Sequence, residues 1–168
     1  MPRKKKTSRG NGNGSREHLI KTRDVVITLT LEAPRDVVFR AWTEPEQLSQ
    51  WFGPRGFSAP SPEIEPRPEG VVRLDLRGPD GTRYPNRGTV REIEEPERFA
   101  FETSLPDEKG SPILHVLNTV TLSEDRGRTT LTLKAHVLDA TPAAAKFVEQ
   151  MHAGWSQTLD RLSEHIVK

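Results

Sequence analysis

The C-terminal stretch from Thr141 to Lys168 is TPAAAKFVEQMHAGWSQTLDRLSEHIVK, and it carries the strongest indication of the fold. Thr141 and Pro142 are typical of a helix start. Large apolar residues then recur at steps of four, four, four, three and four, which is the spacing of one face of an α-helix. These residues are Phe147, Met151, Trp155, Leu159, Leu162 and Ile166. Burial of each contributes about 1.5–3 kcal/mol, so the helix must lie on an apolar surface.

The segments before this helix predict that surface. Residues 24–32 (DVVITLTLE) place apolar side chains at every second position, which is typical of a strand with one buried face. Turn residues such as Gly78-Pro79-Asp80-Gly81 indicate antiparallel hairpins. Further strands are expected near 71–77, 83–93, 98–104, 113–122 and 129–137, with an interrupted edge strand at most in the proline-rich segment 57–68.

Two short helices are expected directly after the first strand. Pro34 suits the first turn of one helix, whose apolar face includes Val38 and Trp42. Pro45 begins the second, which Gly53 ends. The predicted fold class is therefore α+β, with a curved antiparallel sheet of about seven strands wrapped around the long C-terminal helix.

Composition indicates a folded protein of one domain. The chain has 168 residues, of which 33% are apolar and 29% charged, and its formal net charge is +1. It has no cysteine, which excludes disulfides and thiolate metal sites and favours a cytoplasmic location. No segment approaches the roughly 18 consecutive apolar residues of a membrane helix, so no membrane partner is expected.

Residues 1–18 are expected to form a disordered basic tail before the folded domain, residues 19–168. The tail holds six Lys or Arg and one Glu, which leaves 19 basic and 23 acidic residues in the domain. Its content of Gly, Asn, Ser and Lys cannot bury enough apolar surface to fold. The run Arg3, Lys4, Lys5 and Lys6 either contacts nucleic acid weakly through phosphates or only solubilises the chain.

Several short motifs resemble those of a known family. They include Trp51-Phe52-Gly53-Pro54, Tyr84-Pro85-Asn86, Glu95-Pro96-Glu97-Arg98 and Gly154-Trp155. Their order is similar to that of the START-like (SRPBCC) superfamily and, within it, of the group homologous to the C-terminal domain of the activator of the ninety-kilodalton heat-shock protein ATPase. The resemblance covers residues 23–167. It implies a helix-grip fold whose cavity, between the sheet and the long helix, holds hydrophobic small molecules.

The phase of each strand predicts which side chains this cavity presents. Three polar residues, Asn86, Glu92 and Asn118, share the inward phase with the apolar walls. A buried polar group without a partner costs a few kcal/mol, so each must be paired, hydrated at the mouth or reserved for a ligand. The other expected ligand contacts are Trp51, Leu74, Leu76, Val90, Phe101, Val120, Met151 and Trp155.

Three functions from different classes remain open. The preferred one is a protein that binds a hydrophobic small molecule. The second is a chaperone-binding protein, as the family name suggests, although the two-domain activators carry an additional N-terminal domain. The third is a cyclase-like or aromatase-like enzyme that uses Glu92 or a histidine of the cavity wall as a general base. Glu92 could instead pair with Arg91 or Arg98 in solvent at the end of its strand.

No motif in the sequence assigns a catalytic residue, a metal or a cofactor. His115, His136 and His152 lie on three different predicted elements without the spacing of metal ligands. The serines lack the context of a nucleophile elbow. The glycines of residues 10–14 follow no strand, so they do not form a phosphate loop. The sequence therefore predicts no catalytic residue, no metal and no cofactor.

Overall fold

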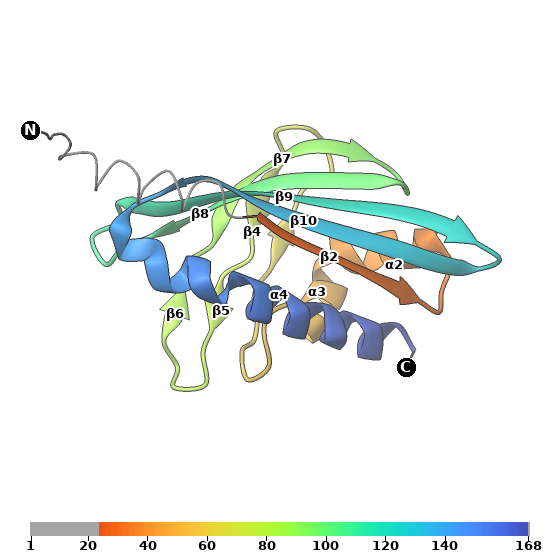
Figure 1. Ribbon diagram of the computed structural model, residues 1–168, viewed down its shortest axis with the longest axis horizontal. Helices are drawn as coiled ribbons and strands as arrows, with labels where there is room; N and C mark the ends of the chain where they lie inside the picture. The colour runs from red at the N-terminus through yellow and green to blue at the C-terminus, as the bar shows by residue number, and fades with distance from the viewer. Residues whose placement is uncertain (1–23, 168) are drawn as a thin grey trace, which may run out of the picture.

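The computed structural model describes residues 24–167 and confirms the predicted fold class (Figure 1). Seven strands form one antiparallel sheet in the order β2-β10-β9-β8-β7-β4-β3, and β5 and β6 form a separate hairpin. The predicted tail, residues 1–18, lies outside the described residues. The strands are β2 (Asp24–Leu31), β3 (Glu63–Ile64), β4 (Val71–Arg73), β5 (Leu76–Arg77), β6 (Arg83–Tyr84), β7 (Arg87–Glu94), β8 (Arg98–Pro106), β9 (Pro112–Asp125) and β10 (Arg128–Ala140).

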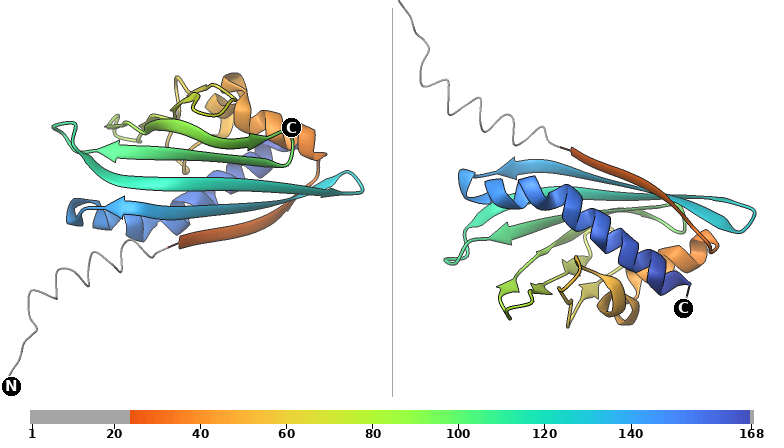
Figure 2. Two further views of the ribbon diagram at one scale, coloured as in Figure 1. Left: turned by 90° about the horizontal axis from the view of Figure 1, so that it is seen from above. Right: turned by 60° about the horizontal axis from the view of Figure 1, so that its bottom comes forward.

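The long helix α4 (Ala145–Ile166) lies across one face of the sheet (Figure 2). It follows a single 3₁₀ turn, η1 (Pro142–Ala144), so Thr141 precedes that turn instead of capping the α-helix. The two short helices, α2 (Arg35–Thr43) and α3 (Pro45–Trp51), follow β2 as predicted. Among the helices of residues 24–167, none is both long and apolar enough to span a membrane.

The apolar core consists of two clusters. The tryptophan cluster surrounds Trp42 and Trp51 and buries Leu159 and Leu162, from the C-terminal half of α4. The valine cluster lies at the other end of α4. It includes Val116, Val137, Ala144 and Val148. The predicted apolar stripe of α4 therefore contacts both clusters. Leu159 and Leu162 are buried, and the other members of the stripe are half-buried.

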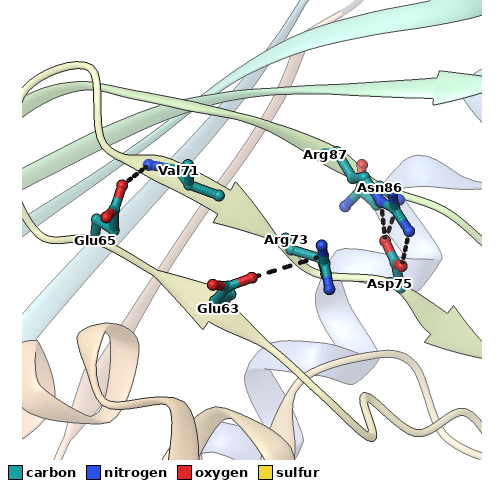
Figure 3. A network of polar contacts seen from close by, with 7 residues as sticks. All are labelled: Glu63, Glu65, Val71, Arg73, Asp75, Asn86 and Arg87. Atoms are coloured by element: carbon teal, nitrogen blue, oxygen red, sulfur yellow. Dashed lines mark hydrogen bonds and ion pairs between the residues drawn. The ribbon is translucent and has the colours of Figure 1, made fainter.

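The predicted strand 71–77 is divided between the two sheets, because the chain turns a corner at Asp75. The Leu74 N–H donates to the Asn86 carbonyl (2.8 Å) across this corner. The Asp75 carboxylate accepts hydrogen bonds from the Asn86 N–H (2.9 Å) and from Nη2 of Arg87 (2.8 Å) (Figure 3). These bonds hold the β5–β6 hairpin against the main sheet.

Charge pairing at this corner links stability to pH. Partial burial alone would raise the pKa of Asp75, but the hydrogen bonds from Arg87 and Asn86 outweigh it and hold that pKa below its ordinary value of 3.8. Because the folded-state pKa is the lower one, Asp75 contributes stability that is present above about pH 3.8 and is lost as the pH falls through the folded-state pKa.

We predict that Asp75→Asn lowers the free energy of unfolding near neutral pH, and that its difference from the original chain shrinks on acidification below about pH 4. Urea denaturation across this range measures the difference. Glu63→Gln is the control, because the Glu63–Arg73 pair is exposed and loose (3.7 Å) and its loss should change little. If Asp75→Asn lowered the free energy of unfolding by the same amount at every pH, the prediction would be contradicted.

Candidate functional site: a cavity between the sheet and α4

A cavity of about 550 Å³ lies between the inner face of the sheet and the N-terminal half of α4. Side chains of both core clusters line it, so the cavity occupies the space where the two clusters meet. Its walls come from the segment after α3, the β5–β6 hairpin, β8, β9 and α4. The lining residues are Phe52, Gly53, Pro54, Phe57, Leu76, Tyr84, Asn86, Phe101, Thr103, Leu105, Leu114, Val116, Asn118, Phe147, Gln150, Met151, Ala153, Gly154, Trp155, Gln157 and Thr158.

The burial of these residues distinguishes the floor of the cavity from its mouth. The floor consists of buried residues of β8 and β9, such as Phe101 and Val116. Gln150, Ala153 and Gln157 are exposed and lie along one face of α4. The opening therefore lies along this face of α4, beside the β5–β6 hairpin.

Aromatic rings form much of the wall. Trp155 packs against Phe52 (ring centroids 5.9 Å apart) and against Trp42 behind it (6.1 Å). Tyr84, on the hairpin, contacts Phe57 (5.8 Å) and Phe147 of α4 (6.3 Å). Flat side chains thus border the cavity on its helix side and on its hairpin side.

The cavity has no charged lining among the residues described. Tyr84 is the one lining side chain in that part of the chain with an ionisable group, and no Asp, Glu, Lys, Arg or His lines the space. An ion without a partner is costly in such surroundings, because the charge loses its hydration. The cavity therefore suits a neutral molecule.

The segment 52–57 is fixed to α4 by polar side chains. Nη1 of Arg161 donates to the carbonyl oxygens of Gly53 (2.9 Å) and Phe57 (3.1 Å). Burial lowers the pKa of Arg161, and the nearby Arg55 lowers it further, although a guanidinium remains protonated. The Arg55 N–H donates to Oε1 of Gln157 (3.1 Å). These bonds hold Phe52, Pro54 and Phe57 at the cavity.

Gly53 is required at the start of this segment. Its φ of +111° is unfavourable for other residues, and a Cβ atom there would lie 3.0 Å from Cδ2 of Leu76. Leu76 itself lines the cavity, so the close approach of this segment to β5 closes one wall.

The predicted site residues are only partly brought together at the cavity. Six of them line it: Leu76, Asn86, Phe101, Asn118, Met151 and Trp155. Leu74, Val90 and Val120 face the same side of the sheet but are buried in the tryptophan cluster, away from the space. Trp51 was expected at the cavity, but it lies in the core. It is fully buried, and its Nε1 donates to the Ala41 carbonyl (3.0 Å). The next residue, Phe52, lines the cavity in its place.

Glu92 faces away from the cavity, so its predicted inward placement is wrong. The register of β7 against β8 shifts between Val90 and Glu92, where a bulge inserts one residue. A bulge reverses the facing of the residues beyond it. Glu92 is exposed and pairs with Arg98 (3.3 Å). Ile93 instead packs against the tryptophan cluster.

Several lining residues were not predicted as ligand contacts. Thr103 follows Phe101 by two positions in β8, so strand alternation could have identified it. Phe57 and Pro54 lie in a loop whose position depends on Arg161, about a hundred residues away in the sequence, and no local pattern indicates them.

The seven-stranded sheet around a long C-terminal helix defines a START-like protein of the helix-grip type. The chain matches the family model described as "Activator of Hsp90 ATPase homolog 1-like protein" over residues 32–166. The protein therefore belongs to this family, and the resemblance found in the sequence is confirmed.

Solved structures share the fold. Protein NE0264 from Nitrosomonas europaea is 27% identical, with a TM-score of 0.70 over 84% of this chain and 92% of that one. Protein Ms6760 from Mycobacterium smegmatis is 26% identical, with a TM-score of 0.70 over 86% and 91%. A protein from Arthrobacter aurescens, 22% identical with a TM-score of 0.76 over 88% of each chain, shows likeness of fold alone. No curated protein matches this chain.

We predict that Arg161→Met frees the segment 52–57 from α4. Because several backbone carbonyls lose a charged donor, the free energy of unfolding should fall by about 1–3 kcal/mol. Amide hydrogen exchange in residues 53–57 should accelerate in the same variant. Arg40→Met is the control, since it removes a guanidinium from an exposed pair with Asp36 (3.3 Å) on α2, and Arg40 makes no contact with segment 52–57. If amide exchange in residues 53–57 were unchanged in Arg161→Met, Arg161 would not be what fixes this segment to α4.

Proposed function

We propose that this protein binds a neutral, largely apolar small molecule in the cavity between the sheet and α4. The observation that supports the proposal is a space of about 550 Å³ with apolar and aromatic walls and no charged lining residue in the described part of the chain. Protein interiors otherwise leave few voids larger than a water molecule. Ligand sites in proteins typically have volumes of about 300–1,000 Å³.

The enzyme alternative has less support. Glu92, the expected general base, pairs with Arg98 outside the cavity. His115 lies on the outer face of the sheet, the face away from α4, where its Nε2 contacts Oε1 of Glu102 (2.7 Å). Neither group lines the space in which a substrate would lie.

The chaperone alternative and the cellular location stay predictions. The family description names an activator of Hsp90 ATPase, but no contact within residues 24–167 favours a chaperone over other partners. The cytoplasmic location rests on the absence of cysteine from the sequence. The nucleic-acid contact of the run Arg3 to Lys6 falls outside the described residues.

We predict that the neutral fluorophore N-phenyl-1-naphthylamine binds the full chain at a single saturable site, with enhanced emission because the dye leaves water. Val116 lies on the floor of the cavity, so Val116→Trp should fill part of the space and weaken binding by about tenfold or more. Fluorescence titration measures both affinities.

Leu117→Trp is the matched control, because Leu117 follows Val116 in β9 and faces the outer side of the sheet. It should bind the dye as the original chain does. Equal binding by the two tryptophan variants would place the dye outside the cavity and refute the proposed site. Circular dichroism and thermal unfolding of each variant verify that it is folded.

A further inference from the structure

We infer that the ligand carries a hydroxyl group, which Asn118 and Thr103 recognise at the floor of the cavity. The inference rests on the proposed function and adds the chemical class of the ligand, a neutral hydroxylated molecule with a flat apolar body. It follows from a count of hydrogen-bonding groups at two buried side chains.

The two residues lie together on the inner face of the sheet. Asn118 of β9 pairs in register with Phe101, and Thr103 of β8 pairs with Val116, so the two polar side chains are diagonal neighbours. They are only 3% and 5% exposed, respectively, and both line the cavity. Of the other polar lining residues, Gln150 and Gln157 are exposed at the mouth, and Tyr84 and Asn86 are half-buried. Thr158 is buried, but its hydroxyl already donates to the Gly154 carbonyl (2.7 Å).

The hydrogen bonds of this pair are incomplete. Nδ2 of Asn118 donates to Oγ1 of Thr103 (3.3 Å) and to the Phe101 carbonyl (3.4 Å). Among the described residues, none donates to Oδ1 of Asn118, and the Thr103 hydroxyl serves only as an acceptor. The floor therefore offers one free acceptor and one free donor. A ligand that displaces water from these atoms without replacing their hydrogen bonds would lose about 1–3 kcal/mol for each.

A ligand hydroxyl complements both free groups. Its proton can be donated to Oδ1 of Asn118, and its oxygen can accept the proton of the Thr103 hydroxyl. The two side chains are within reach of one such group, since Nδ2 of Asn118 is already 3.3 Å from Oγ1 of Thr103. A ketone or an ether can only accept, so it would leave Oδ1 of Asn118 unpaired.

The surroundings of this pair favour a flat apolar body for the rest of the ligand. Phe101 lies beside Asn118 on the floor, and Trp155 and Phe52 line the same space. The uncharged lining described above disfavours a carboxylate, a phosphate or an ammonium group on the ligand. A phenol-like molecule fits both the polar floor and the aromatic walls.

The test compares three biphenyls of similar shape, which are 4-hydroxybiphenyl, 4-methylbiphenyl and 4-formylbiphenyl. Each displaces N-phenyl-1-naphthylamine from the full chain, and the displacement gives its affinity. We expect 4-hydroxybiphenyl to bind about tenfold more tightly than 4-methylbiphenyl, because only the hydroxyl satisfies both floor groups. The aldehyde should be weaker than the phenol, because it brings no donor.

Three variants assign the preference to its residues. Asn118→Leu and Thr103→Val keep approximately the size of each side chain and remove its hydrogen bonds. In both, the preference for the hydroxyl over the methyl group should fall below about threefold, while 4-methylbiphenyl binds at least as well as before. Thr119→Val is the matched control. Thr119 follows Asn118 in β9, faces the outer side of the sheet and does not line the cavity, so the preference should persist.

The outcomes separate this inference from the proposed function. If the dye binds but the original chain does not prefer the phenol, the hydroxyl inference fails and the proposed function stands. The inference also fails if Asn118→Leu and Thr103→Val retain the full preference. If neither the dye nor any biphenyl binds the folded chain, the proposed function fails together with the inference.

Discussion

The apolar stripe of α4 has to be buried, and the sheet, α2 and α3 are arranged around the helix accordingly. Over Leu159 and Leu162, side chains of α2 and α3, such as Trp42 and Trp51, fill the space beside the sheet. Around Met151 no helix of residues 24–167 fills the space between α4 and the sheet. The β5–β6 hairpin and the segment 52–57 border that space without filling it. Trp155 marks the boundary, because it contacts Trp42 and also lines the cavity. The cavity exists because side chains fill the space beside the C-terminal half of α4 and leave it open beside the N-terminal half.

Charged groups near the cavity hold the backbone of its walls in place, and they do not line the cavity. The Arg161 guanidinium holds the carbonyls of segment 52–57, and the Asp75 carboxylate holds the corner between β4 and β5. Both anchors position wall residues while their charges remain outside the lining. A rim that is polar and a lining that is uncharged are compatible with an apolar ligand that enters from water and is then desolvated.

The sequence predicts the fold because its periodicities are local. The steps of three and four in α4 and the alternation in β2 predict these elements directly, and the structure confirms both. Where facing depends on a bulge, the same method fails. Glu92 was assigned inward by counting in twos from Val90. Because of the bulge, the next inward-facing residue is Ile93, three positions beyond Val90. Phe57 could not be predicted, because Arg161 positions it across the molecule.

A crystal structure of the chain soaked with 4-bromobiphenyl, with the bromine located by its anomalous scattering, tests whether the space between the sheet and α4 takes up an apolar ligand. We expect a bromine peak inside the cavity, in contact with lining side chains such as Phe101, Met151 or Trp155. A space filled by repacked side chains would contradict ligand binding between the sheet and α4. A bromine found only on the outer face of the sheet would contradict it equally.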